Sequence, residues 1–112
     1  MTAGSGPRER LDVITIGRCS VDLYGQQIGS RLEDVTSFAK SVGGCPSNIA
    51  IGTARLGLRS GLITRVGDEQ MGRFVKEQMA REGVALDGIA TDRERLTSLV
   101  LLSVENDKTF PL

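Results

Sequence analysis

The sequence predicts an α/β fold in which helices alternate with the strands of a parallel sheet. Short runs rich in β-branched and aliphatic residues, LDVITIG at 11–17 and LRSGLITRVG at 58–67, are typical of buried strands. Segments with helical periodicity follow these runs. Strands that alternate with helices form right-handed βαβ units around a parallel sheet. A chain of 112 residues is one small domain or a piece of a larger one.

Composition narrows the classes of function. The formal net charge is zero, which gives no argument for binding nucleic acid or an anionic membrane. No apolar run reaches the roughly 18 residues that a membrane span needs. Residues 1–10, MTAGSGPRER, lack the apolar core of a secretory signal, so we expect a disordered lead-in and a cytoplasmic protein.

The chain contains no histidine, which excludes Ser-His-Asp and Cys-His catalysis within it. Its two cysteines, Cys19 and Cys45, do not make a disulfide framework. We expect both to be free thiols that pack as small apolar side chains, with a redox role as the alternative.

The segment after the first strand is polar and mixed. Residues 18–42 hold two weakly alternating stretches, around 23–28 and 35–39. Alternation with a period of two indicates strands. We interpret this segment as a β-excursion from the main sheet.

A helix is predicted over 46–57. Pro46 suits its first turn and Gly57 its C-terminal end. Apolar residues surround the helix, which predicts that it is largely buried; they are Ile49, Ala50, Ile51, Ala54 and Leu56. Gly52 either lets the helix lie close to a sheet or is tolerated at about 1 kcal/mol.

The next strand and helix are predicted over 58–67 and 68–83. Asp68 is the expected N-cap and Gly83 the stop. One face of this helix carries apolar residues at helical spacing, which predicts a core face; they are Met71, Phe74, Val75 and Met79.

The remaining elements are short. A strand and turn are predicted over 84–92, and another strand over 97–104. Residues 105–108 suggest a hairpin turn, and 109–112 begin a return strand. A chain that stops inside a hairpin suggests a truncated protein.

Candidate binding residues gather where one strand ends and the next helix begins. Ligands of open parallel sheets bind beyond the carboxyl ends of the strands. Asp22 follows the first strand, Gly43 and Gly44 offer unobstructed backbone N–H groups, and Asn48 offers both a donor and an acceptor. This mixture fits a polyhydroxylated molecule better than a phosphate. Arg18 could pair with a substrate carboxylate or form a surface ion pair.

Each of these residues has a structural alternative. The role of the two glycines could be limited to forming a turn, and that of Asn48 to capping the helix, with no ligand involved. Neither a Walker loop nor a G-x-G-x-x-G fingerprint is present, which disfavours a nucleotide loop or a dinucleotide-binding domain.

The stretch GGCPSNIAIGTARLGLRSGLITRVG resembles the first signature of the PfkB (ribokinase-like) carbohydrate kinases. The resemblance spans residues 11–112. Further stretches, GRCSVDLYGQQIGSRLEDVTSFAK, TRVGDEQMGRF and TDRERLTSLVLLSV, are similar to the branch that phosphorylates 5-dehydro-2-deoxy-D-gluconate in myo-inositol catabolism. The resemblance implies a three-layer, Rossmann-type parallel sheet with a β-lid, of which this chain is the N-terminal portion.

The resemblance also implies roles. Asp22, Gly43, Gly44 and Asn48 would bind the sugar, and segments 23–42 and 97–112 would form the lid, through which a homodimer could form. ATP, Mg²⁺ and the catalytic Asp would be held by residues that follow Leu112, so the chain alone would be inactive. The alternatives are a kinase of 2-keto-3-deoxygluconate or fructose, and a non-catalytic module that associates through its lid.

Overall fold

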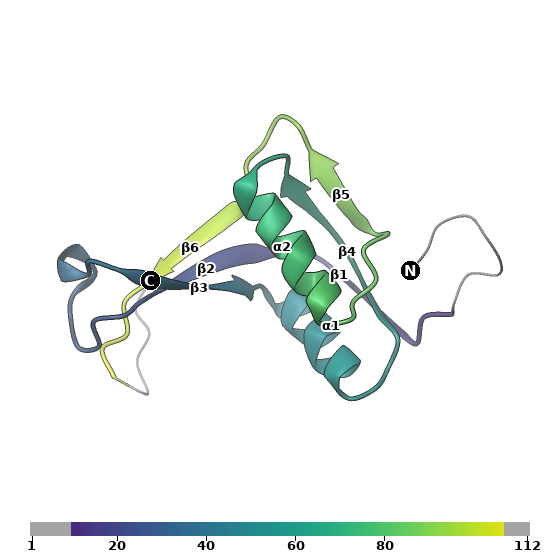
Figure 1. The fold of residues 1–112 in the computed structure, drawn as a ribbon, viewed down its shortest axis with the longest axis horizontal. Coiled ribbons are helices and arrows are strands. Elements are labelled where there is room, and N and C mark those ends of the chain that lie inside the picture. The colour runs from purple at the N-terminus through teal and green to yellow at the C-terminus, as the bar shows by residue number, and fades with distance from the viewer. Residues whose placement is uncertain (1–9, 107–112) are drawn as a thin grey trace.

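A computed structural model describes residues 10–106, in which two small sheets and two helices form one α/β unit (Figure 1). The main sheet is three-stranded in the order β1-β4-β5, with β1 at Val13–Ile16, β4 at Ser60–Gly67 and β5 at Ile89–Asp92. Both pairings are parallel, as predicted. Helices α1, Cys45–Arg55, and α2, Gln70–Arg81, connect these strands.

The second sheet extends away from the main sheet and the two helices (Figure 1). Its order is β3-β2-β6, with β2 at Ser20–Gly25, β3 at Phe38–Gly43 and β6 at Ser98–Leu102. Strand β2 runs antiparallel to β3 and parallel to β6, and a short 3₁₀ helix, Leu32–Asp34, lies between β2 and β3. The predicted β-excursion is therefore confirmed.

Three predicted segments lie wholly or partly outside the described residues. They are the return strand at 109–112, the lead-in at 1–10 except for residue 10, and the second half of the predicted turn at 105–108. Within the described part, β6 is shorter than the predicted strand 97–104 and pairs with β2.

The core lies between the two helices and the sheets. Val75 and Met79 of α2 are fully buried against Leu62 and Val66 of β4 and Val21 of β2. Met71 and Phe74 pack at the edge of this cluster. The predicted apolar face of α2 is thus its core face.

The start of α2 differs from the prediction. Its N-cap is Glu69, whose Oε1 accepts a hydrogen bond of 2.9 Å from the backbone N–H of Gly72. Asp68 is exposed, and its backbone N–H donates to the carbonyl oxygen of Asp92. The N-cap is one residue later than expected, and the Glu69 carboxylate accepts both from this N–H and from the N–H of Thr97, just before β6.

Helix α1 is less buried than predicted. Only Ser47 and Ala50 are buried, while Ile49 is exposed and Leu56 has 83% of its surface exposed. The helix packs one side on β1 and β4, and no described element covers its outer side. Gly52 has open space at the position of a Cβ, so it is a tolerated glycine and not a point of close approach.

Helix α1 is slightly shorter than the predicted helix 46–57 and its C-cap is Leu56, but the residue types at its ends act as predicted. Pro46 stands in the first turn, and Gly57 follows the helix with a φ of +93°, which favours glycine. Neither helix described in residues 10–106 is long and apolar enough to cross a membrane.

The helices cover only one face of the main sheet. Successive strand residues point to opposite faces, and Thr15 of β1 faces α1, where its Oγ1 donates to the carbonyl oxygen of Pro46 at 2.8 Å. Ile14, Ile16 and Ile63 therefore lie on the other face, and all three are exposed among the described residues.

Candidate functional site

The predicted carboxylate, Asp22, lies in the middle strand of the second sheet. It is half-buried, with Ser41 of β3 and Val100 of β6 as its neighbours in register. The hydroxyl of Ser20 donates a hydrogen bond of 2.9 Å to Asp22 Oδ1. Side chains two apart in a strand share a face, so Ser20 and Asp22 point to the same side of the sheet.

Gly43 lies directly beside this carboxylate. It ends β3, pairs with Ser20, and is buried. A Cβ on Gly43 would overlap the Oδ2 and Cγ atoms of Asp22. The structure thus joins two of the predicted site residues, a carboxylate and a bare backbone unit, in one place.

Gly44 has a structural reason to be glycine. It is the N-cap of α1, with φ at +99° and ψ at 133°, a conformation that is open to glycine almost alone. A Cβ there would overlap the carbonyl oxygen of Arg18. The space beside the Gly44 backbone, where a ligand was expected, is occupied by the segment between β1 and β2. A ligand role for Gly44 stays a prediction.

Asn48 lies one turn into α1 and is exposed. Since the N-cap is Gly44, which forms no side-chain cap bond, the alternative that Asn48 only caps the helix is wrong. Asn48 borders a groove of about 420 Å³ that Ser41 and Phe74 also line. Its side chain therefore borders a different hollow from that of Arg18.

Arg18 lines a cavity of about 490 Å³ that lies just past the carboxyl end of β1 and beside the middle of β4, together with Thr64 and Ser98. Ser98 is the register partner of Ser20, so one wall of the cavity continues into the face that carries Asp22. The β1 side of this cavity agrees with the general rule that open parallel sheets bind ligands beyond the carboxyl ends of their strands.

The two cysteines are free, as expected. Cys45 is exposed and Cys19 is buried. Burial raises the pKa of the Cys19 thiol, the nearby hydroxyl of Ser47 opposes this shift, and the charge of Asp22 adds to it. The Cys19 thiol therefore stays protonated and unreactive at neutral pH.

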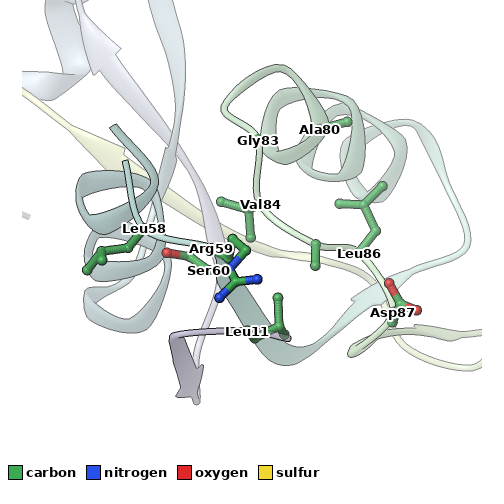
Figure 2. A pocket seen from close by; sticks show the side chains of 10 residues that line it. Leu11, Leu58, Arg59, Ser60, Ala80, Gly83, Val84, Leu86 and Asp87 are labelled. Atoms are coloured by element: carbon green, nitrogen blue, oxygen red, sulfur yellow. The ribbon is translucent and has the colours of Figure 1, made fainter. Parts of the chain in front are cut away.

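A further pocket lies at the opposite end of the main sheet (Figure 2). Its volume is about 300 Å³, and its lining includes Ser60 at the start of β4 and Gly83 just after α2. Arg59 projects beside it, but its Nη2 already pairs with Asp12 Oδ1 at 3.1 Å. None of the predicted site residues lines this pocket, so we do not assign it as the site.

Ser20 does not stand out in the sequence, because a lone serine in a strand carries no signal of its own. The spacing S-x-D in a segment of period two could have shown that the hydroxyl and the carboxylate share a face.

A parallel sheet with two helices on one face, joined to a small second sheet that carries a carboxylate, defines the ribokinase-like α/β fold in its N-terminal portion. The chain matches the pfkB family carbohydrate kinase model over residues 10–110 and belongs to that family.

Curated relatives carry the name 5-dehydro-2-deoxygluconokinase. The protein of Geobacillus thermodenitrificans is 40% identical over 97 residues, which cover 86% of this chain and 29% of that protein. The protein of Lacticaseibacillus casei is 44% identical over 84 residues, which cover 75% of this chain and 26% of that protein. The chain thus spans less than a third of the length of these relatives.

Solved structures share the fold. A PfkB protein from Polaromonas sp. JS666 superposes with a TM-score of 0.84 at 33% identity, and the match covers 91% of this chain and 34% of that chain. A sugar kinase from Pyrococcus horikoshii in complex with ATP superposes with a TM-score of 0.82 at 33% identity, and the match covers 88% of this chain and 33% of that chain. A fructokinase from Halothermothrix orenii superposes with a TM-score of 0.77 at 33% identity, and the match covers 83% of this chain and 34% of that chain.

Proposed function

We propose that the chain is the substrate-binding part of an ATP-dependent kinase that phosphorylates 5-dehydro-2-deoxy-D-gluconate, a step of myo-inositol catabolism in the cytoplasm. The observation that carries the proposal is the Asp22 carboxylate held beside the bare backbone of Gly43. The names of the curated relatives support the choice of substrate.

In this proposal the site residues divide the work of binding. The Asp22 carboxylate accepts hydrogen bonds from two neighbouring sugar hydroxyls, each worth roughly 1.5–3 kcal/mol because the acceptor is charged. Asn48 donates and accepts further bonds. Arg18 pairs with the carboxylate of the sugar acid from the cavity just past the carboxyl end of β1.

The phosphoryl chemistry belongs to residues outside this chain. ATP supplies the phosphoryl group and Mg²⁺ balances its charge, and we place both sites, with the general base, in the part of the protein that follows residue 112. What the chain itself does is bind and orient the sugar acid. The second sheet acts as the lid that excludes water from the reacting hydroxyl.

We also propose that the lid is the contact between two copies of the protein. Leu99 and Leu101 alternate along β6 on one face and are both exposed among the described residues. Apolar side chains on the strand of a small sheet favour packing against a second sheet.

A second candidate is a kinase of fructose or of 2-keto-3-deoxygluconate. The similarity to a fructokinase structure favours the first of these. Arg18 separates the candidates, because fructose has no carboxylate for it to bind.

The test is a substrate comparison with the complete kinase that carries this chain. We expect kcat/KM to be highest for 5-dehydro-2-deoxy-D-gluconate, lower for 2-keto-3-deoxygluconate and lowest for fructose. Arg18→Ala should lower kcat/KM for the two acids and leave that for fructose unchanged. A preference for fructose that Arg18→Ala does not alter would contradict the proposed substrate.

A further inference from the structure

We propose that Ser20 is a positioning residue of the sugar site, which fixes the Asp22 carboxylate in the orientation that binds hydroxyls. The inference rests on the proposed function, in which Asp22 contacts the sugar. Two observations on Asp22 carry it: its hydrogen bond from the hydroxyl of Ser20, and its position in the space that a side chain on Gly43 would fill.

Ser20 acts through Asp22 and not on the ligand. Its side chain is 0% exposed, so no sugar in the site can contact it in this arrangement. A buried hydroxyl needs a hydrogen-bond partner, and the Oδ1 atom of Asp22 at 2.9 Å supplies it. A bond to a charged acceptor is among the stronger hydrogen bonds in a protein.

Two features hold the Asp22 carboxylate. Its Oδ1 accepts a hydrogen bond from Ser20, and the whole carboxylate, with Oδ2 nearest, occupies the space that a Cβ on Gly43 would fill. We name Ser20 and Gly43 together the carboxylate seat. The seat fixes the plane of the carboxylate before any ligand arrives.

A fixed carboxylate binds better than a mobile one. A side chain that must be ordered on binding loses conformational freedom at that moment, and a seated one has already lost it. Geometry held by a neighbouring hydrogen bond also keeps both acceptors in line with the sugar hydroxyls. The seat is therefore expected to affect sugar affinity and not ATP affinity.

The first measurement uses Ser20→Ala in the complete kinase. We expect KM for 5-dehydro-2-deoxy-D-gluconate to rise roughly tenfold, as is common when the hydrogen-bond partner of a binding group is removed, and KM for ATP to stay unchanged. The control is Ser60→Ala, which also removes a buried, hydrogen-bonded hydroxyl: Ser60 is 1% exposed and bonds to Thr53 Oγ1 at 2.6 Å. This control should leave both KM values unchanged.

The second measurement separates positioning from mere stability. In an Asp22→Ala background, Ser20→Ala should not lower kcat/KM further, because Ser20 acts only through that carboxylate. Its effect on Tm, if the buried hydroxyl also stabilises the fold, should persist in both backgrounds. Additive losses of kcat/KM would overturn the inference.

Gly43→Ala tests the other half of the carboxylate seat, and it replaces Ser20→Ala in the test if that variant does not fold. Its Cβ displaces the carboxylate, so KM for the sugar acid should rise in the native background and not in the Asp22→Ala background. A rise of equal size in both would overturn the inference.

The inference and the proposed function fail differently. If Asp22→Ala keeps full kcat/KM, Asp22 does not bind the substrate and the proposed function fails. If Asp22→Ala is impaired while Ser20→Ala behaves like Ser60→Ala, the site stands and only the positioning role is wrong.

Discussion

Two adjacent glycines at the start of α1 are needed for different physical reasons. Gly43 is needed because the Asp22 carboxylate fills the space of its Cβ. Gly44 is needed because its positive φ and the nearby carbonyl oxygen of Arg18 both exclude a side chain. A substitution at Gly43 should therefore affect binding first, and one at Gly44 should affect folding first.

Gly44→Ala should destabilise the protein. Its backbone conformation costs a non-glycine residue about 1–3 kcal/mol, before the overlap with Arg18 is counted. The control is Gly52→Ala in the same helix, where no atom lies within 4 Å of the new Cβ and the gain in helix propensity is about 1 kcal/mol. Thermal unfolding of both variants should show Tm shifts of opposite sign. A Gly44→Ala variant with unchanged Tm would show that the backbone can relax there.

At the scale of the elements, Glu69 joins the start of α2 to the start of β6. Its Oε1 accepts from the N–H of Gly72 at 2.9 Å, and its Oε2 accepts from the N–H of Thr97 at 2.7 Å. These bonds, that of Thr97 first, lower the pKa of Glu69 below its usual 4.5. One carboxylate thus links the residue before strand β6 to the first turn of helix α2.

Glu69→Ala should lower the unfolding free energy by about 1 kcal/mol at neutral pH, the usual cost of a lost N-cap. A carboxylate with a lowered folded pKa stabilises above its unfolded pKa and loses that effect as the pH falls through the folded pKa. The difference between native and variant should therefore be full at pH 6–7 and shrink below about pH 4.5.

The matched control is Asp68→Ala, the cap that the sequence pattern favours. Asp68 is exposed and its side chain does not cap the helix, so the unfolding free energy should change by less than about 0.5 kcal/mol. A larger effect at Asp68 than at Glu69 would contradict the observed cap.

How well the sequence predicts an element depends on how many of its faces are apolar. Strand β4 and helix α2 could be predicted because burial on the core side leaves a strong pattern. The strands β2 and β3 gave only weak alternation, because one face packs near Phe74 while the other carries Asp22 and Ser41. The burial of α1 was overestimated, since apolar content does not say whether a covering element is present.

The site follows the same logic. Asp22, Gly43 and Gly44 could be found from residue type and position. The contact of Ser20 with Asp22 could not, because it depends on register and rotamer. The separation of Asn48 from the Arg18 cavity also depends on how α1 turns away from β3, which no local pattern specifies.

At the scale of the whole molecule, residues 10–106 cover only one face of the main sheet. Ile16 has 71% of its surface exposed, and Ile14 and Ile63 lie beside it on the same face. Parallel sheets are normally covered on both faces. We expect the remaining length of a full-size family member to cover this face.

The 112-residue chain by itself should therefore associate and should not phosphorylate any sugar. Light scattering at rising protein concentration is expected to show dimers or larger species, driven by this apolar face and by the unpaired edge of β1. Ile16→Lys should reduce the association, while Leu56→Lys, at the exposed C-cap of α1, should reduce it less. A monomer at all concentrations would mean that the face is covered in another way, and measurable turnover would contradict the proposed location of the catalytic residues.

The measurement that tests the central claim most directly is kcat/KM of Asp22→Ala in the complete kinase with 5-dehydro-2-deoxy-D-gluconate and ATP. Loss of two hydrogen bonds to a charged acceptor, at roughly 1.5–3 kcal/mol each, predicts a fall of at least a hundredfold. Asp87→Ala, an exposed carboxylate beside the pocket at the other end of the sheet (Figure 2), should leave kcat/KM unchanged. Full activity of a folded Asp22→Ala variant would contradict the account, because the carboxylate beside Gly43 would then have no part in holding the sugar.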